Sequence, residues 1–323
     1  MINKIFQISS PDEFNQNALN VFEYQYNNNS LYQTFCNNLK RNPKSVNKIE
    51  DIPFMPISFF KNHKIICEGK NEEIVFLSSG TTGANTSKHF VTDLEIYEKS
   101  FSEGFKHFYG NIQDYCILAL LPSYLEREGS SLVHMVNNLI EKSRHKDSGF
   151  YLHNIKELSN KLLELQSDKQ KTLLIGVSFA LLEMAKSHTV SIPDAIIMET
   201  GGMKGRGKEL VRKELHDILC KGFGVEKIHS EYGMTELLSQ AYSKGDGLFE
   251  CTPWMKVMIR DVYDPLNILP SKASGAINII DLANINSCSF IATDDLGKVY
   301  KDGSFEVTGR MDASDVRGCN TMI

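Results

Sequence analysis

The chain has 323 residues, 41% of them hydrophobic and 23% charged, which is sufficient for two lobes or for one large α/β domain with a substantial core. Its formal net charge of -5 gives no support to the clustered basic surface of a nucleic-acid-binding protein, so we expect no nucleic-acid partner. The N-terminus lacks the apolar stretch of a signal peptide and no apolar run is long enough to span a bilayer, which predicts a cytoplasmic protein without a membrane span.

Residues 1 to about 70 are expected to be helical and irregular. The run 74–77 is apolar and partly β-branched and leads into a Ser/Gly/Thr stretch, which predicts a buried strand followed by a turn. Thr92 and Glu95 have the spacing of a capping box. They precede a predicted helix whose apolar side chains recur at helical spacing: Leu94, Tyr97, Phe101, Phe105 and Phe108.

Strands and helices are then expected to alternate. We predict strands at 116–121, 172–175 and 195–198, a helix at 131–142, and a helix at 209–220 that buries Leu210, Val211, Leu215, Ile218 and Leu219. Such alternation predicts parallel sheets flanked by helices. After about Pro253 only short β segments follow, at 257–259, 276–280 and 290–293. The predicted organisation is therefore an N-terminal helical segment (1–70) packed on the main lobe, an α/β core (71–250) and a small β-rich subdomain (251–323).

The first motif is the Ser/Gly/Thr loop after the strand at 74–77. Its glycines let the backbone approach an anion, and its successive N–H groups and hydroxyls can form a concave anion site to which Lys88 adds positive charge. The spacing is not that of a Walker loop, and a solvated loop is the alternative. We predict that Lys88 is catalytic and that the loop binds the phosphates of ATP through Ser79, Gly80, Thr81, Thr82 and Gly83.

The second motif, at 230–236, joins an aromatic ring to an acid. Tyr232 can stack on a flat base, Thr235 can donate to the α-phosphate, and Glu236 offers a hard oxygen ligand for Mg²⁺. The alternative is a helix start with an acidic first turn. We assign Thr235 to catalysis and Glu236 to the metal. In this motif we also predict that Glu231, Tyr232 and Gly233 bind ATP. A glycine pair that can line a purine follows the strand at 195–198, and we predict that Gly201 and Gly202 bind ATP as well.

The third motif contains Asp295, which can accept both ribose hydroxyls, and Arg310, which can donate to the ribose or to a phosphate. A plain hairpin is the alternative, because Asp-Gly at 302–303 is itself a turn signal. Each motif alone is weak. Together they form a phosphate cradle, an aromatic platform with a metal ligand, and a ribose clamp, which predicts an enzyme that activates a carboxylic acid as an acyl-adenylate with ATP and Mg²⁺.

In type and order the motifs resemble those of the adenylate-forming superfamily of acyl-CoA synthetases, luciferases and nonribosomal adenylation domains. From about residue 50 to the end the chain is more closely similar to the LuxE-type acyl-protein synthetases, through the loop and the stretches 52–61, 201–206 and 315–319. The resemblance implies the superfamily's N-terminal-type lobe of two parallel sheets with flanking helices and a β-rich subdomain, with the nucleotide between them. Asp294 departs from the usual Thr-Gly-Asp of the third motif. The mobile C-terminal lid domain and its lysine are expected to be absent, because the sequence ends soon after Arg310.

The seven cysteines show no CxxC spacing and are odd in number, so they suggest neither a zinc site nor a disulfide framework. The resemblance implies that Cys319, near the end of the chain, receives the acyl group as a thioester, and Arg317 can lower its pKa. An unreactive cysteine in a frayed terminus is the alternative. The implied function is activation of a carboxylic, by resemblance fatty, acid and its transfer to this cysteine for delivery to an acyl reductase or transferase.

Two other functions remain open. The acyl group can instead pass to coenzyme A or to a carrier protein, or the chain can be a nucleotide-binding subunit without catalysis. The sequence does not identify the acid. His134 and His229 are considered as residues that line the acyl pocket, although a lone histidine is more often packed or solvated.

Overall fold

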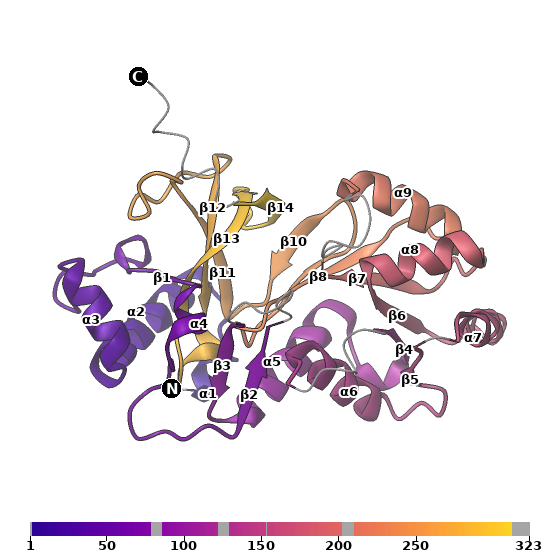
Figure 1. The fold of residues 1–323 in the computed structure, drawn as a ribbon, viewed down its shortest axis with the longest axis horizontal. Helices are drawn as coiled ribbons and strands as arrows, with labels where there is room; N and C mark the ends of the chain where they lie inside the picture. The colour runs from indigo at the N-terminus through magenta and orange to yellow at the C-terminus, as the bar shows by residue number, and fades with distance from the viewer. Residues whose placement is uncertain (1, 79–85, 122–128, 153, 202–209, 312–323) are drawn as a thin grey trace.

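A single mixed sheet of twelve strands organises the fold, and a separate two-stranded hairpin lies beside it (Figure 1). The structure is a computed structural model that describes residues 2–78, 86–121, 129–152, 154–201 and 210–311. The strand order is β11-β12-β13-β14-β10-β9-β8-β7-β6-β4-β5, and β1 pairs with β13.

One half of the sheet is parallel. Its strands are β4 (Cys116–Leu120), β5 (Gly149–Phe150), β6 (Thr172–Val177), β7 (Ile196–Thr200) and β8 (His229–Tyr232). Every residue of β4 and β6 is buried, as expected for continuous apolar strands covered on both faces. The helices of this half are α5 (Leu94–Tyr109), α6 (Ser131–Ser143), α7 (Ile155–Ser167), α8 (Ser178–Ser187) and α9 (Arg212–Phe223), with η2 (Ile112–Asp114) before β4.

The other half of the sheet is antiparallel except for β1. Its strands are β1 (Met55–Pro56), β9 (Ala241–Ser243), β10 (Leu248–Cys251), β11 (Met255–Arg260), β12 (Ser274–Asp281), β13 (Phe290–Val299) and β14 (Phe305–Arg310). β10 pairs with β9 on one side and with β14 on the other, so it joins the two halves. The short helix η3 (Leu282–Asn284) follows β12.

The N-terminal helices pack against the antiparallel half of the sheet (Figure 1). The buried side chain of Gln25 in α2 donates to the carbonyl oxygens of Asn284 and Ile285 at 3.0 and 2.9 Å. This contact ties the first segment of the chain to η3. The elements of this region are α1 (Ile2–Ile5), α2 (Pro11–Asn28), α3 (Ser30–Asn38), η1 (Ile49–Asp51) and α4 (Phe59–Asn62).

The α/β class, the flanking helices and the β-rich later region are confirmed, and four details differ from the predictions. The parallel strands lie in one sheet, not two. The run 74–77 is β2 (Ile74–Leu77), an edge of an antiparallel hairpin with β3 (Lys88–Val91), and within it only Phe76 is buried. Asp93, not Thr92, caps α5 by accepting from the Ile96 N–H at 3.3 Å. Val211 lies before α9 and is 70% exposed instead of buried. The three-segment domain division remains a prediction.

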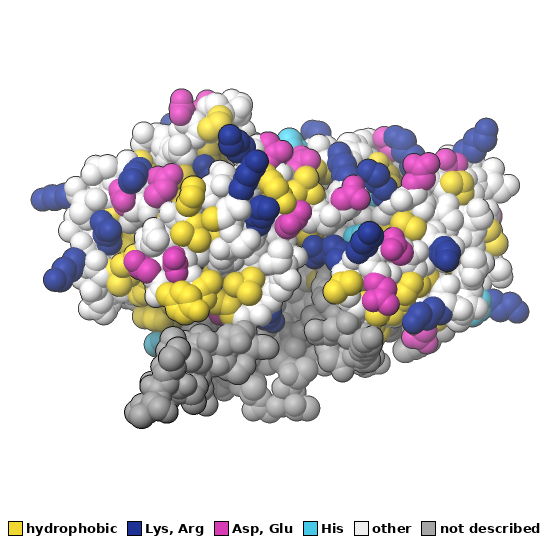
Figure 2. Space-filling view, turned by 90° about the horizontal axis from the view of Figure 1, so that it is seen from above, with side chains coloured by type: hydrophobic (Ala, Val, Ile, Leu, Met, Phe, Trp, Pro, Cys, Tyr) yellow, Lys and Arg dark blue, Asp and Glu magenta, His cyan; other side chains and the backbone are white. Residues whose placement is uncertain are grey.

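The described surface carries both signs of charge. Figure 2 shows lysine and arginine side chains among aspartate and glutamate side chains, with small groups of hydrophobic side chains between them. Within the described ranges, none of the helices is both long enough and apolar enough to cross a bilayer.

Candidate active site

The strands β7 and β8 end at the same edge of the sheet because they are parallel, and this is where ligands bind in open α/β sheets. Gly201 follows β7 directly and has a φ of +67°, a conformation that favours glycine. The Ser178 hydroxyl donates to the Gly201 carbonyl oxygen at 2.6 Å and fixes the turn. Gly202 lies outside the described residues.

The predicted phosphate loop, with Ser79, Gly80, Thr81, Thr82 and Gly83, lies outside the described residues, but both of its ends are described. The Ser78 N–H donates to the Ser87 carbonyl oxygen at 3.0 Å, and the Ser87 N–H donates to the Ser78 Oγ at 2.9 Å. Lys88, the first residue of β3, is exposed and pairs with Leu77. The loop is therefore closed at its base, and the lysine predicted to be catalytic stands at its exit.

Tyr232, Asp295 and Arg310 come together although they belong to three different strands. The Tyr232 hydroxyl donates to Asp295 Oδ2 at 2.8 Å, and Arg310 Nε lies 3.8 Å from Asp295 Oδ1. Burial raises the pKa of the Asp295 carboxyl, and Tyr232 and Arg310 offset part of that rise. The aromatic and ribose-binding residues predicted from separate motifs thus form one cluster, in which both Asp295 oxygens already face a donor.

Thr235 and Glu236 lie in the turn after β8. Glu236 is 5% exposed, and burial raises the pKa of its carboxyl, although a hydrogen bond from Ser87 and the positive charges of Arg310 and Lys61 lower it in part. The predicted metal ligand therefore lies near both the base of the phosphate loop and Arg310.

A magnesium ion fits this donor set. Within the described ranges, no group of three or more His, Cys, Asp or Glu side chains could hold a metal ion. Mg²⁺ usually keeps several waters and is bound by one or two carboxylates together with substrate phosphates. A single buried carboxylate such as Glu236 suits a metal that arrives with the nucleotide.

Two residues that support this turn were not predicted from the sequence. His89, in β3, is fully buried and its Nδ1 lies 2.8 Å from the Thr235 carbonyl oxygen. Asn284, at the end of η3, lies 3.0 Å from His89 Nε2 and donates to the Glu236 carbonyl oxygen at 2.8 Å. His89 directly follows Lys88, but nothing local in the sequence indicates its partners.

Glu199 and Glu231 are buried carboxyls on opposite faces of the sheet. Glu199 pairs with Ser230, and Thr200 pairs with Glu231, so successive side chains alternate between the faces. Burial raises the pKa of Glu231 to about 7, although the Thr200 hydroxyl donates to its Oε2 at 2.5 Å. A Cβ on Gly233 would lie 2.4 Å from Glu231 Oε1, so a side chain there would displace this carboxyl.

Glu199 was not predicted as a site residue. Burial by itself raises its pKa, but contacts with His216, Ser230, Arg212 and Ser178 outweigh burial and hold the pKa below its ordinary value. The His216 Nε2 lies 3.6 Å from Glu199 Oε1, and the Ser178 Oγ lies 2.9 Å from Glu199 Oε2. Since the same hydroxyl contacts Gly201, Glu199 supports the turn predicted to line the purine.

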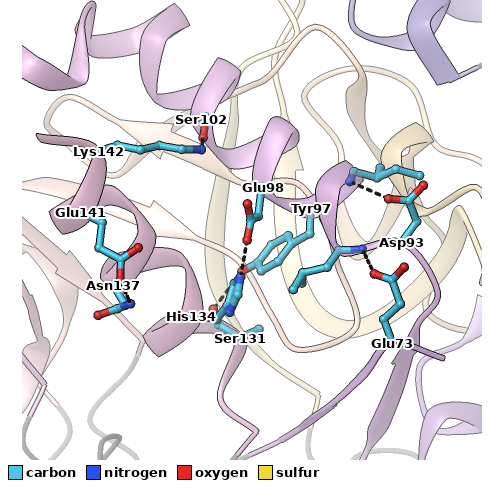
Figure 3. Close-up of polar contacts among 12 residues, drawn as sticks. Glu73, Asp93, Tyr97, Glu98, Ser102, Ser131, His134, Asn137, Glu141 and Lys142 are labelled. Carbon is cyan, nitrogen blue, oxygen red and sulfur yellow. Dashed lines mark hydrogen bonds and ion pairs between the residues drawn. The ribbon is translucent and has the colours of Figure 1, made fainter.

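His134 and His229 both pack against helix α5. Figure 3 shows the His134 ring beside Tyr97, with its Nε2 directed at Glu98 of α5, 3.1 Å from Oε1. His229 Nδ1 lies 3.2 Å from the Tyr109 hydroxyl, at the opposite end of that helix. These contacts show that both histidines are packed residues. That either of them lines the acyl pocket stays a prediction.

Burial raises the pKa of every cysteine in the described ranges. The pKa values are raised to about 12 for Cys36, Cys67 and Cys251 and to about 11 for Cys116, and are also raised for Cys220 and Cys288. A raised pKa keeps a thiol protonated and unreactive at neutral pH. Cys319, the predicted acyl acceptor, lies outside the described residues.

The sequence matches the family described as acyl-protein synthetase, LuxE, over residues 7–323. A curated relative, the long-chain-fatty-acid–luciferin-component ligase of Vibrio harveyi, is 24% identical over 326 residues, which cover 93% of this chain and 84% of the relative.

Solved structures of acyl-CoA ligases share the fold. A 2-hydroxyisobutyryl-CoA ligase in an open conformation, in complex with 2-HIB-AMP and CoA, matches with a TM-score of 0.68 and 11% identity, over 94% of this chain and 70% of that one. ATP-bound MatB from Rhodopseudomonas palustris matches with a TM-score of 0.55 and 17% identity, over 73% of this chain. The match spans about half (47%) of the MatB chain.

Proposed function

This chain belongs to the acyl-protein synthetase (LuxE) family of ligases, and on that premise we propose that it activates a carboxylic acid with ATP and then carries the acyl group on its own cysteine. The observation that carries the proposal is the meeting of Tyr232, Asp295 and Arg310 at the edge of the sheet where Glu236 also lies. An aromatic ring, a ribose acceptor, a cation and a metal-binding carboxylate are together suited to a nucleoside triphosphate.

In the first half-reaction, a carboxylate oxygen of the acid attacks the α-phosphorus of ATP. The new P–O bond forms the acyl-adenylate as the bond to the departing pyrophosphate breaks. In this proposal Tyr232 faces the adenine, Asp295 and Arg310 hold the ribose, and Thr235 donates to the α-phosphate. Glu236 would hold Mg²⁺, which would neutralise charge on the pyrophosphate. Lys88 and the loop at 79–83 bind the remaining phosphate oxygens.

In the second half-reaction, the Cys319 thiolate attacks the acyl carbonyl carbon, and the C–O bond to AMP breaks. The acyl group is then a thioester, and AMP leaves with both electrons of the broken bond. The raised pKa values of the six described cysteines support a nucleophile elsewhere in the chain. The Vibrio relative is named as a ligase of long-chain fatty acids, so we propose a fatty acid as substrate and an acyl reductase or transferase as partner.

The test is the intact mass of the protein after incubation with Mg-ATP and a panel of saturated fatty acids, 2-hydroxyisobutyrate and benzoate. We expect a mass gain equal to the acid minus water, absent in Cys319→Ala and retained in the matched control Cys220→Ala. Pyrophosphate release without a mass gain, followed by acyl transfer to added coenzyme A, would instead identify an acyl-CoA ligase. ATP binding with no pyrophosphate release from any acid would reject catalysis and leave a nucleotide-binding subunit.

A further inference from the structure

A buried side-chain bridge links the strand that leaves the phosphate loop to the turn that carries Thr235 and Glu236. His89 lies in β3, the second strand of the hairpin whose loop is closed by Ser78 and Ser87. Its imidazole is fully buried and packs edge-on against the Phe60 ring, with the centroids 5.6 Å apart. The ring therefore has one fixed orientation.

One nitrogen of this imidazole faces the active-site turn, and the other faces Asn284 of η3. Nδ1 lies 2.8 Å from the Thr235 carbonyl oxygen, while Nε2 lies 3.0 Å from Asn284 Oδ1. The amide of Asn284 in turn donates to the Glu236 carbonyl oxygen at 2.8 Å. The Thr235 carbonyl oxygen thus lies against the imidazole, and the Glu236 carbonyl oxygen is held by the asparagine.

The turn is fixed on its other side by Asp281. This carboxylate accepts from the N–H groups of Leu238 and Ser239 at 2.7 and 3.0 Å and is fully buried. The segment after Glu236 is therefore anchored to the end of β12, and the segment at Thr235 and Glu236 is anchored to β3 and η3. Side chains that act in charge stabilisation need such supports, because small displacements from the productive geometry are costly.

We propose that His89 is a positioning residue which, with Asn284, holds the turn at Thr235 and Glu236 against β3, the strand that follows the predicted phosphate loop. His89 touches neither the acid nor ATP in this proposal. It acts through the backbone of the turn, which carries the Glu236 carboxylate that would hold the metal. The role rests on the proposed function, because the phosphates and the metal are those of that reaction.

The chemistry of the ring allows the two contacts to be separated. A neutral imidazole has a single ring N–H, and burial lowers the pKa of His89 to about 4, which keeps the ring neutral at neutral pH. Only one of the two ring nitrogens therefore donates to the oxygen that it faces. His89→Asn retains a donor near the Nδ1 position, and His89→Gln retains one near Nε2. His89→Leu retains neither contact at a similar volume.

The experiment measures pyrophosphate release with Mg-ATP and tetradecanoate, at saturating and limiting Mg²⁺. We expect His89→Leu to lower kcat by about 10–100-fold, as loss of an outer support of a metal ligand typically does, with the KM for the acid within about threefold. Of His89→Asn and His89→Gln, the variant that restores the donor of the native tautomer should recover part of the loss. His89→Leu combined with Asn284→Ala should lose no more than the worse single variant, because the two side chains act in one chain of contacts.

Gln25→Leu is the matched control. It removes buried hydrogen bonds to the far side of η3, at Asn284 and Ile285, without touching Thr235 or Glu236. Its melting temperature should fall while the kcat of the folded enzyme stays within about twofold. An equal loss of kcat in Gln25→Leu, or wild-type kcat in folded His89→Leu, would overturn the proposal.

Hydrogen exchange separates this proposal from the proposed function. Amides of 234–239 should exchange faster in His89→Leu than in wild type, with no nucleotide added. If the wild type releases no pyrophosphate from any acid, the proposed function fails, and the exchange rates still report whether His89 holds the turn. Unchanged exchange there would overturn the positioning role by itself.

Discussion

At the scale of single residues, two buried carboxyls on neighbouring strands have opposite pKa shifts. Glu231, 8% exposed, has the Thr200 hydroxyl as its short donor among the described residues, and burial raises its pKa to about 7. Glu199, 7% exposed, is buried as deeply, but His216, Ser230, Arg212 and Ser178 lower its pKa below the ordinary value. The partners on each face of the sheet, rather than depth, decide the charge state.

These shifts predict opposite effects of pH on stability. Between pH 4.5 and about 7, Glu231 keeps its proton in the folded chain and loses it in the unfolded chain. The free energy of unfolding therefore falls as the pH rises through this range, by on the order of 3 kcal/mol. Glu231→Gln should flatten that fall.

Glu199 supplies stability that is present above its ordinary pKa and is lost as pH falls, so Glu199→Gln should lose stability mainly at neutral pH. Urea unfolding from pH 4 to 8 measures both, and parallel curves for the two variants would contradict the assignment.

At the scale of elements, α8 and α9 approach each other through a glycine. A Cβ at Gly222 of α9 would lie 2.4 Å from the Ala185 Cβ and 2.8 Å from its Cα, both in α8. These atoms belong to a helix backbone and to a methyl group, neither of which can rotate away. The close packing of the two helices therefore depends on the absence of a side chain.

Gly222→Ala should destabilise the fold by about 1–3 kcal/mol, the usual cost of overpacking, despite the better helix propensity of alanine, worth about 1 kcal/mol. Gly149→Ala is the control, because no atom lies within 4 Å of its Cβ position. Chemical denaturation of both variants measures the difference. A stability of Gly222→Ala equal to that of Gly149→Ala would show that the helices can separate at no cost.

At the scale of the whole molecule, the candidate site draws on both halves of the sheet. Tyr232 ends the last parallel strand, whereas Asp295 and Arg310 lie on β13 and β14 of the antiparallel half. β9 and β10 lie between them in the strand order. A nucleotide bound to all three residues would therefore link the two halves.

Mg-ATP should accordingly raise the melting temperature, because a ligand that binds only the folded state at 100 times its Kd adds about 2.7 kcal/mol. Arg310→Gln should weaken this shift while leaving the melting temperature without nucleotide unchanged, since the side chain is 72% exposed. Lys301→Gln, in the exposed turn between β13 and β14, is the control. An equal shift in wild type and Arg310→Gln would exclude that arginine from nucleotide binding.

The sequence predicted the elements with strong local patterns. The apolar runs became β4 and β6, and the helical spacing from Leu94 onward became α5. The cap of α5 was misplaced by one residue because Thr92 and Asp93 are both good capping types. The strand at 74–77 was expected to be buried, and its position at the edge of a hairpin depends on where β3 lies.

The sequence by itself determined the types of element and the chemical groups of the motifs, because periodicity and residue type are local properties. It also placed Tyr232 and Glu236 in one motif and Asp295 and Arg310 in another. Only the tertiary structure decided that the Tyr232 hydroxyl meets Asp295, that His89 lies against the Thr235 carbonyl oxygen, and that the pKa values of Glu199 and Glu231 shift in opposite directions. These contacts join residues far apart in the chain, and burial and hydrogen bonding at such points depend on the path of the folded backbone rather than on neighbouring residues.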